Sequence, residues 1–198
     1  MSRDIAQHLI EKSSKGDAEA FSEIYFSLKD PLYGFAFRMT NTVSIAEEIT
    51  QEVFLFFIEN SEKYDAERGS LFSFLCGVAR NKVLNYLKKS GTRLETNDLE
   101  EDLFESPSNT WGRSPIRNLL DKEFSGKLEQ CVQSLPPYQK EVLLLREIEE
   151  LSYEEIAAIT ETNIGTIKQR LYRARQALAA GLEPYLKTEE VKYELHRS

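Results

Sequence analysis

The chain has 198 residues, of which 41% are hydrophobic and 29% are charged, a composition typical of one large or two small folded domains rather than of intrinsic disorder. Its formal net charge is -8, which argues against a protein that coats nucleic acid through its overall field. Apolar runs stay below the ~18 residues of a membrane span, and the N-terminus lacks the apolar core of a signal peptide. We therefore expect a cytoplasmic protein without membrane insertion.

Cysteine usage indicates neither zinc binding nor redox chemistry. Cys76 and Cys131 stand 55 positions apart and form no CxxC pair, and a disulfide would be unusual in the cytosol. Free cysteine behaves as a small hydrophobic residue. We expect two buried thiols, no metal site and no cofactor.

Helical periodicity dominates the N-terminal half, because apolar residues recur at spacings of three and four rather than two. The pattern predicts a helix over residues 44–60, a second helix over 71–89, and a loop between them that is rich in Asn, Asp, Ser and Gly. One side of the first helix is apolar. Another side carries Glu48, Gln51, Glu52 and Leu55.

Charge is segregated in the middle of the chain. Residues 80–93 hold five cations and no acid, whereas residues 95–105 hold six acids and no cation. Helical periodicity lapses over residues 92–113, which are polar and contain Pro107 and Gly112. This segment is predicted to be a flexible acidic linker between two small helical domains.

Helices resume after the linker. Ser114 followed by Pro115 is a helix-start signal, an apolar stripe runs from Ile116 to Leu135, and a further helix is predicted over residues 138–150. The fold class is therefore all-α.

Residues 151–178 have the pattern of a helix-turn-helix. Ser152 and Glu155 form a capping box that starts one helix, and residues 160–162 break it. A second helix, from about residue 162, buries an apolar stripe of Ile164, Ile167, Leu171, Ala174 and Leu178. Its other face is cationic, which suits a DNA backbone and base edges.

Taken together, these segments resemble the sigma-70 superfamily of bacterial RNA polymerase sigma factors, in its short extracytoplasmic-function group. Residues 46–89 are similar to region 2, which in the family binds core RNA polymerase and opens the -10 element. Residues 134–178 are similar to region 4, which binds the -35 element. The implied division is region 2 over 1–91, a linker over 92–113, region 4 over 114–182 and a C-terminal tail over 183–198.

The resemblance also implies site residues. Docking on core RNA polymerase is expected of Glu48, Gln51, Glu52 and Phe54. Binding of the -10 strand, including capture of an unstacked base, is expected of Tyr64, Asp65, Arg68, Gly69, Ser70, Arg80, Asn81, Lys82, Asn85 and Lys88. Phe74 stands where the family often has Trp, and we interpret Phe72 and Phe74 as core residues.

Binding of the -35 element is expected of Thr166, Lys168, Gln169, Arg170, Tyr172, Arg173 and Arg175. In this set the helix geometry turns Lys168, Gln169, Tyr172 and Arg173 toward the major groove, where they would read bases. Arg170 and Arg175 lie to the sides, where they would hold phosphates.

The implied partners are core RNA polymerase, promoter DNA and an anti-sigma factor, with no small-molecule substrate. A plain helix-turn-helix regulator is an alternative, but it leaves the basic segment at 80–93 unexplained. A sigma mimic that binds an anti-sigma factor is another, although such a decoy is expected to lose the cations of residues 168–175. An enzyme has little support, because the sequence has no phosphate-cradling Gly-rich loop and no GxSxG, and its histidines lie at opposite ends.

Overall fold

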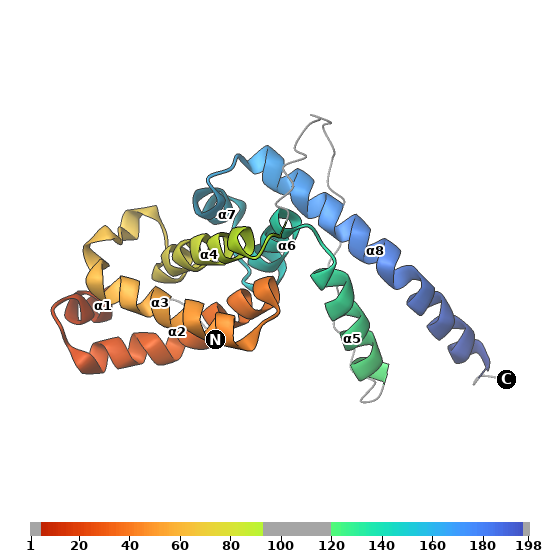
Figure 1. Cartoon of the computed structure of the whole chain (residues 1–198), viewed down its shortest axis with the longest axis horizontal. Helices are drawn as coiled ribbons and strands as arrows, with labels where there is room; N and C mark the ends of the chain where they lie inside the picture. Colours follow the sequence, from red (N-terminus) through yellow and green to blue (C-terminus); the bar gives the residue numbers. More distant parts are fainter. Residues whose placement is uncertain (1–4, 93–119, 196–198) are drawn as a thin grey trace.

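A computed structural model describes the backbone of residues 5–92 and 120–195, and the side chains of residues 5–92 and 124–183. Within these residues every regular element is helical (Figure 1), which confirms the all-α prediction. The first half contains α1 (Gln7–Ser14), α2 (Ala18–Thr40), α3 (Val43–Glu59), the short turns η1 (Ser61–Lys63) and η2 (Ala66–Arg68), and α4 (Leu71–Lys89). The second half contains α5 (Leu120–Gln133), α6 (Pro137–Leu143), η3 (Leu144–Ile148), α7 (Tyr153–Thr160) and α8 (Ile164–Leu195).

Helix α2 is the longest element of the first half and precedes every helix expected there. The side chain of Asp17 caps it by accepting hydrogen bonds from the backbone N–H groups of Glu19 and Ala20, both at 3.0 Å. It ends at Asn41, whose φ of 53° is left-handed, a conformation that Asn tolerates better than most residues. Its buried stripe packs against α3 and α4.

Local sequence signals predicted some of the other elements, although α1, like α2, was not expected. The observed α3 and α4 match the helices predicted over 44–60 and 71–89. The single helix predicted over 138–150 is instead α6 followed by the π-helical turn η3. Helix α8 continues without a break past residue 183, where the tail was expected to begin. The predicted helix start at Ser114 and residues 93–113 of the predicted linker lie outside the described residues.

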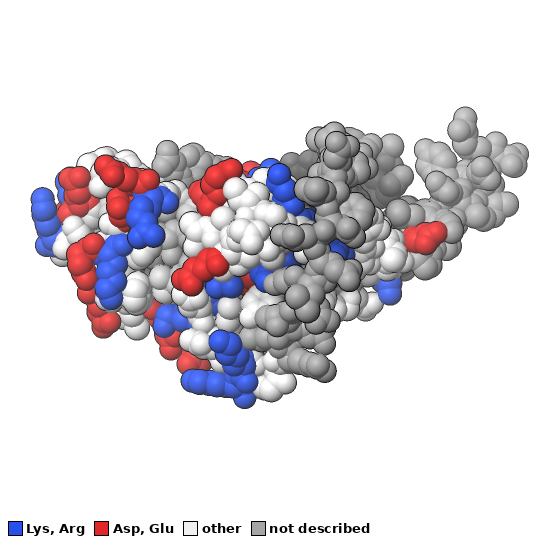
Figure 2. All heavy atoms as spheres, turned by 90° about the horizontal axis from the view of Figure 1, so that it is seen from above, with Lys and Arg blue, Asp and Glu red and all other residues white. Residues whose placement is uncertain are grey.

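Charged side chains of both signs are interspersed over the described part of the face in Figure 2. Positive side chains on this face therefore have acidic neighbours, and no broad single-sign surface emerges there. Over residues 5–92 and 120–195, no helix combines the length and apolar content that a bilayer span requires.

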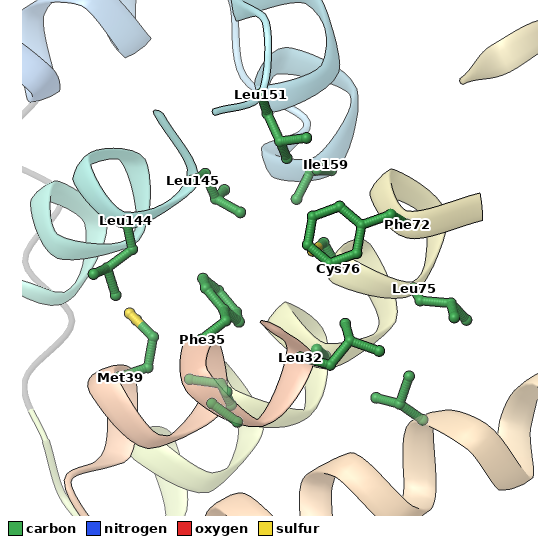
Figure 3. Packing of buried hydrophobic residues seen from close by; sticks show 14 of the residues in the cluster. Leu32, Phe35, Met39, Phe72, Leu75, Cys76, Leu144, Leu145, Leu151 and Ile159 are labelled. Atoms are coloured by element: carbon green, nitrogen blue, oxygen red, sulfur yellow. The ribbon is translucent and has the colours of Figure 1, made fainter. Parts of the chain in front are cut away.

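One hydrophobic core joins the two halves. Helix α4 contacts α7, and α2 contacts α6 and η3. Figure 3 shows Phe72 and Cys76 of α4 pointing toward Ile159 of α7, and Met39 of α2 pointing toward Leu144 of η3. The two halves therefore share buried apolar surface, the main favourable contribution to packing. Cys76 and Cys131 are both buried and form no disulfide, as predicted.

Candidate nucleic-acid and protein interfaces

The outer face of α3 presents the polar residues that the sequence assigned to polymerase binding. Glu48, Gln51 and Glu52 are all exposed. Two apolar side chains extend this face, Leu55 and Ile58, each 56% exposed. Leu55 follows Gln51 by four residues and so shares its side of the helix. The face is mixed in character, with carboxylates beside exposed aliphatic groups.

Phe54 is not part of that surface. Its side chain is 3% exposed, and its ring lies 4.8 Å from that of Tyr25 and edge-on to that of Phe21, with centroids 6.3 Å apart. The segment VFLFF is apolar on every side, so its spacing alone did not identify the inward face. Contact between Phe54 and polymerase is corrected to a structural role in the core.

Side chains of the loop between α3 and α4 hold its backbone in place through hydrogen bonds. The Tyr64 hydroxyl donates to the Gly69 carbonyl at 3.2 Å, and the Asp65 carboxylate accepts from the backbone N–H of Glu67 at 2.9 Å. Gly69 has φ 141° and ψ -179°, a region open essentially to glycine alone. Ser70 then caps α4 by accepting from the N–H of Ser73.

This loop and α4 line a pocket of about 340 Å³. Half of the residues assigned to -10 DNA meet in its wall, namely Asp65, Arg68, Gly69, Ser70 and Asn81. Phe74 also lines the pocket and is only half-buried, whereas Phe72 is a core residue as predicted. The pocket is also lined by Glu155, Ala158 and Ile159 of α7 and by Glu161, which follows that helix.

Three other residues of the predicted -10 set lie outside this pocket. Lys82 and Asn85 lie in a groove between α3 and α4 that Glu48 and Glu52 also line. The Nζ of Lys82 bonds to Oε2 of Glu52 at 2.6 Å. Lys88 is exposed in the last turn of α4. Helix α4 therefore presents one polar side to the pocket and another to the groove beside α3.

Arg80 is the exception, because it is buried. Its Nε and Nη2 donate to the two carboxylate oxygens of Glu141 on α6, at 2.9 and 3.2 Å. Arg80 is 8% exposed and Glu141 is 0% exposed. In this arrangement Arg80 is not on the surface, and its assignment to -10 DNA stays a prediction for a form in which the halves are apart.

The same carboxylate lies near a second cation. Nη1 of Arg170 on α8 is 3.9 Å from Oε1 of Glu141, and its guanidinium lies over the ring of Tyr138, 4.8 Å from the centroid. Burial raises the pKa of Glu141, while the charges of Arg80 and Arg170 oppose that shift. Arg170 is 8% exposed, so the expected phosphate contact is corrected. Arg170 lies beside the apolar stripe of α8, and its side chain points inward.

Helices α7 and α8 form the predicted helix-turn-helix. The capping box is present, since the backbone N–H of Ser152 donates to Glu155 at 2.8 Å and that of Glu155 donates to Ser152 Oγ at 3.1 Å. Glu161 ends α7 in the left-handed conformation. Asn163 then accepts from the N–H of Thr166 at 2.8 Å and starts α8. Ile167, Leu171 and Ala174 are buried as expected.

The outward side of α8 carries the other residues of the -35 set. Lys168 is exposed, with Nζ 5.6 Å from the centroid of the Tyr153 ring. Tyr172 is 37% exposed, and Thr166, Gln169 and Arg173 are half-buried. Arg175 pairs with Glu147 of η3, its Nε donating at 3.2 Å. Lys168, Gln169, Tyr172 and Arg173 lie on one side of α8, as the helix geometry predicted, and Arg175 lies at the edge of that side.

Sequence reasoning missed three residues at the contact between the halves. The Ser73 hydroxyl donates to Glu155 Oε1 at 2.6 Å, and Glu141 binds Arg80. The position of Glu141, four residues before buried Leu145, was a signal, because it puts an acid on an apolar helix face. Nothing local in the sequence indicated its partner.

The chain matches two protein-family models. The family model of sigma-70 region 2 matches residues 24–93, and the family model of sigma-70 region 4 matches residues 125–178. The ECF RNA polymerase sigma-E factor of Escherichia coli K12 is 30% identical over 187 residues, covering 91% of this chain and 96% of that protein. The RNA polymerase sigma-H factor of Pseudomonas aeruginosa is 29% identical over 185 residues, covering 91% and 95%.

Two solved structures have the same fold. CnrH, in complex with the cytosolic domain of CnrY, has a TM-score of 0.66 at 17% identity and covers 92% of this chain and 99% of its own. The sigma factor RpoE, in complex with the anti-sigma factor NepR from Bartonella quintana, has a TM-score of 0.63 at 23% identity and covers 84% and 98%. These similarities establish a common helical arrangement.

Proposed function

Because this chain belongs to the extracytoplasmic-function group of RNA polymerase sigma factors, we propose how its surfaces divide the work of binding core RNA polymerase, recognising promoter DNA and starting transcription. The observation that carries the proposal is the combination of an exposed polar face on α3 with a cationic recognition helix on α8. A DNA-binding module alone would account for the second feature and not for the first. An anti-sigma factor is the partner that would prevent the chain from binding polymerase.

Core RNA polymerase docks on the exposed face of α3 through Glu48, Gln51 and Glu52. Leu55 and Ile58 extend this face with apolar surface, and exposed apolar groups rimmed by polar ones are typical of protein interfaces. The carboxylates give the contact its electrostatic selectivity. The chain works in the cytoplasm, as a binding protein without catalysis of its own.

The -10 strand binds along the loop between α3 and α4, at the pocket that contains Asp65, Arg68 and Asn81. Promoter opening costs stacking energy of ~1.4 kcal/mol per base step. A protein can recover ~1–3 kcal/mol for each base that it stacks or encloses. Binding of unstacked bases in this pocket therefore favours the melted promoter.

The -35 element binds to the outward side of α8. Lys168, Gln169, Tyr172 and Arg173 face the major groove, where Gln and Arg can pair with base edges. Thr166, in the first turn of α8, contacts the DNA backbone, as residues near helix N-termini commonly do. Arg175 contacts phosphate from the side.

Run-off transcription with core RNA polymerase on a library of promoters tests this function. We expect transcripts from a subset of templates that share a -35 and a -10 motif, and no transcripts when either core enzyme or this chain is omitted. Promoter-specific transcripts that are equally abundant without this chain would contradict the proposal. Co-purification with core enzyme separates a sigma factor from a plain helix-turn-helix regulator.

A further inference from the structure

Three elements of region 4 meet at the aromatic ring of Tyr153, the first residue of α7. The guanidinium carbon of Arg146, from η3, lies 4.8 Å from the ring centroid, and Nζ of Lys168, from α8, lies 5.6 Å from it. Both distances fall within the ~6 Å over which an aromatic face attracts a cation. Tyr153 was not assigned to the -35 set, yet it contacts a member of that set.

The ring of Tyr153 is held firmly in place. Its side chain is half-buried and packs against the hydrophobic core, and the capping box of Ser152 and Glu155 fixes the backbone on either side of it. Arg146 in turn donates from Nη1 to the carbonyl of Leu151 at 2.7 Å, which ties this cation to the segment before α7. The ring is therefore a stable support for a side chain that contacts it.

Lys168 is a side chain whose selectivity depends on such a support. It is exposed on the groove-facing side of α8, and a free lysine has many rotamers. A mobile ammonium can donate to acceptors on several neighbouring bases, so it adds affinity with little selectivity. An ammonium held at Tyr153 reaches a narrower range of positions in the major groove, and it has lost part of its rotamer entropy before DNA binds.

An aromatic ring holds a cation without neutralising it. Arg175, on the same helix, is paired with the carboxylate of Glu147, so a phosphate must compete with that carboxylate. At Lys168 the contact is with a ring, which has no net charge and attracts the cation through its quadrupole. The Lys168 ammonium therefore keeps its charge, and its N–H donors remain available for acceptors on base edges.

We propose that Tyr153 is a positioning residue for -35 recognition, whose ring holds the Lys168 ammonium at one base position and thereby sets the base preference there. This inference rests on the proposed function of region 4 and adds a specificity-determining residue to it. The effect belongs to the face of the ring and not to the phenol hydroxyl. Tyr153 therefore acts on base selection through Lys168, without a base contact of its own.

The test measures binding of the holoenzyme to a library of -35 variants, with Lys168→Ala identifying the base position that Lys168 reads. Phenylalanine keeps the ring face, so Tyr153→Phe should retain the wild-type preference at that position. Tyr153→Leu should reduce the preference there by about two- to fivefold, the range that corresponds to an exposed cation–π contact. In the Lys168→Ala background, Tyr153→Leu should cause no further loss of preference, because the side chain that the ring positions is already absent.

The matched control is Tyr138→Leu, which removes a ring that contacts the buried Arg170 on the same helix. This variant should leave the base preferences unchanged. Equal effects of Tyr153→Phe and Tyr153→Leu would overturn the proposal, because the ring face would then have no separate role. A uniform loss across all -35 variants in Tyr153→Leu would overturn it as well.

A second measurement covers the case in which Tyr153→Leu fails to fold, as judged by circular dichroism. In an NMR spectrum of the wild-type chain, the ring current of Tyr153 should shift the Cε protons of Lys168 upfield of those of Lys88, which is exposed in the last turn of α4. Coincident shifts for the two lysines would overturn the proposal. A wild-type holoenzyme without any -35 preference would instead contradict the proposed function itself, so the two failures are distinguishable.

Discussion

The hydroxyl of Ser73 donates a hydrogen bond to Oε1 of Glu155 across 82 residues of sequence, at 2.6 Å. Burial alone would raise the pKa of Glu155, but hydrogen bonds from Ser73 and Ser152 outweigh it and hold that pKa below the usual range. A carboxylate whose pKa is lower in the folded state stabilises that state above the unfolded pKa of about 4.3. That contribution is lost as the pH falls through the folded pKa.

We predict that Ser73→Ala raises the pKa of Glu155 toward its usual value, because it removes a donor that favours the ionised form. An NMR titration of the Glu155 carboxyl carbon in the full chain measures this shift. Ser134→Ala serves as the control, since its hydroxyl donates to the carbonyl of Cys131. Equal Glu155 pKa values in the wild type and in Ser73→Ala would show that the hydrogen bond is not formed in solution.

Alanine at Glu48, Gln51 and Glu52 together should abolish co-purification with core RNA polymerase and leave the melting temperature nearly unchanged. The three side chains are exposed, and the surface pair between Glu52 and Lys82 is worth only ~0–1 kcal/mol. Phe54→Ala should behave in the opposite way, with a loss of about 3–5 kcal/mol of stability. Normal recovery of core enzyme by a folded triple variant would refute the assigned face.

Arg170→Ala should destabilise the chain by roughly 1–3 kcal/mol, because the buried Glu141 carboxylate loses one of its two cations and Tyr138 loses a cation–π contact, while Arg80 keeps its hydrogen bonds. Arg175→Ala is the matched comparison on the same helix. Its pair with Glu147 is exposed on both sides, so the expected cost is below ~1 kcal/mol. Urea unfolding followed by circular dichroism gives both values, and similar losses for the two variants would contradict the buried role of Arg170.

Arg173→Ala and Arg175→Ala should weaken -35 binding of the holoenzyme in different ways. Loss of a base contact at Arg173 should cost ~1–3 kcal/mol and relax the preference at one or two positions. Loss of a phosphate contact at Arg175 should weaken all sequences about equally and lower the salt slope by ~1. Binding across a library of -35 variants at several salt concentrations distinguishes them. A uniform loss for both variants would remove Arg173 from the base-reading set.

Local patterns were sufficient for the helix-turn-helix and for two helices of the first half, whereas α1 and α2 were not predicted. The Ser152 capping box and the apolar spacing of α8 depend on residues within a few positions of one another, so the sequence predicted the helix-turn-helix correctly. The same holds for α3 and α4. Phe54 was misplaced because its neighbours are apolar on all sides of the helix, which leaves the period without a polar face to orient it.

The sequence analysis could not predict contacts between segments that are distant along the chain. Arg80 and Glu141 are 61 residues apart, and their pairing depends on how α4 and α6 meet in space. A cation in a basic stretch was interpreted as a DNA contact, since periodicity carries no information about a partner from another domain. Arg170 contacts the same carboxylate from within its own half, and its place beside the apolar stripe of α8 did not reveal that its side chain is buried.

The loop between α3 and α4 has a thermodynamic consequence. Its backbone is fixed by Asp65, by the Tyr64 hydroxyl and by the cap at Ser70 before any strand arrives. Ordering a residue costs about 1–2 kcal/mol in conformational entropy, and here folding has already met that cost. Most of the interaction energy of a captured base is therefore available for holding the strands apart.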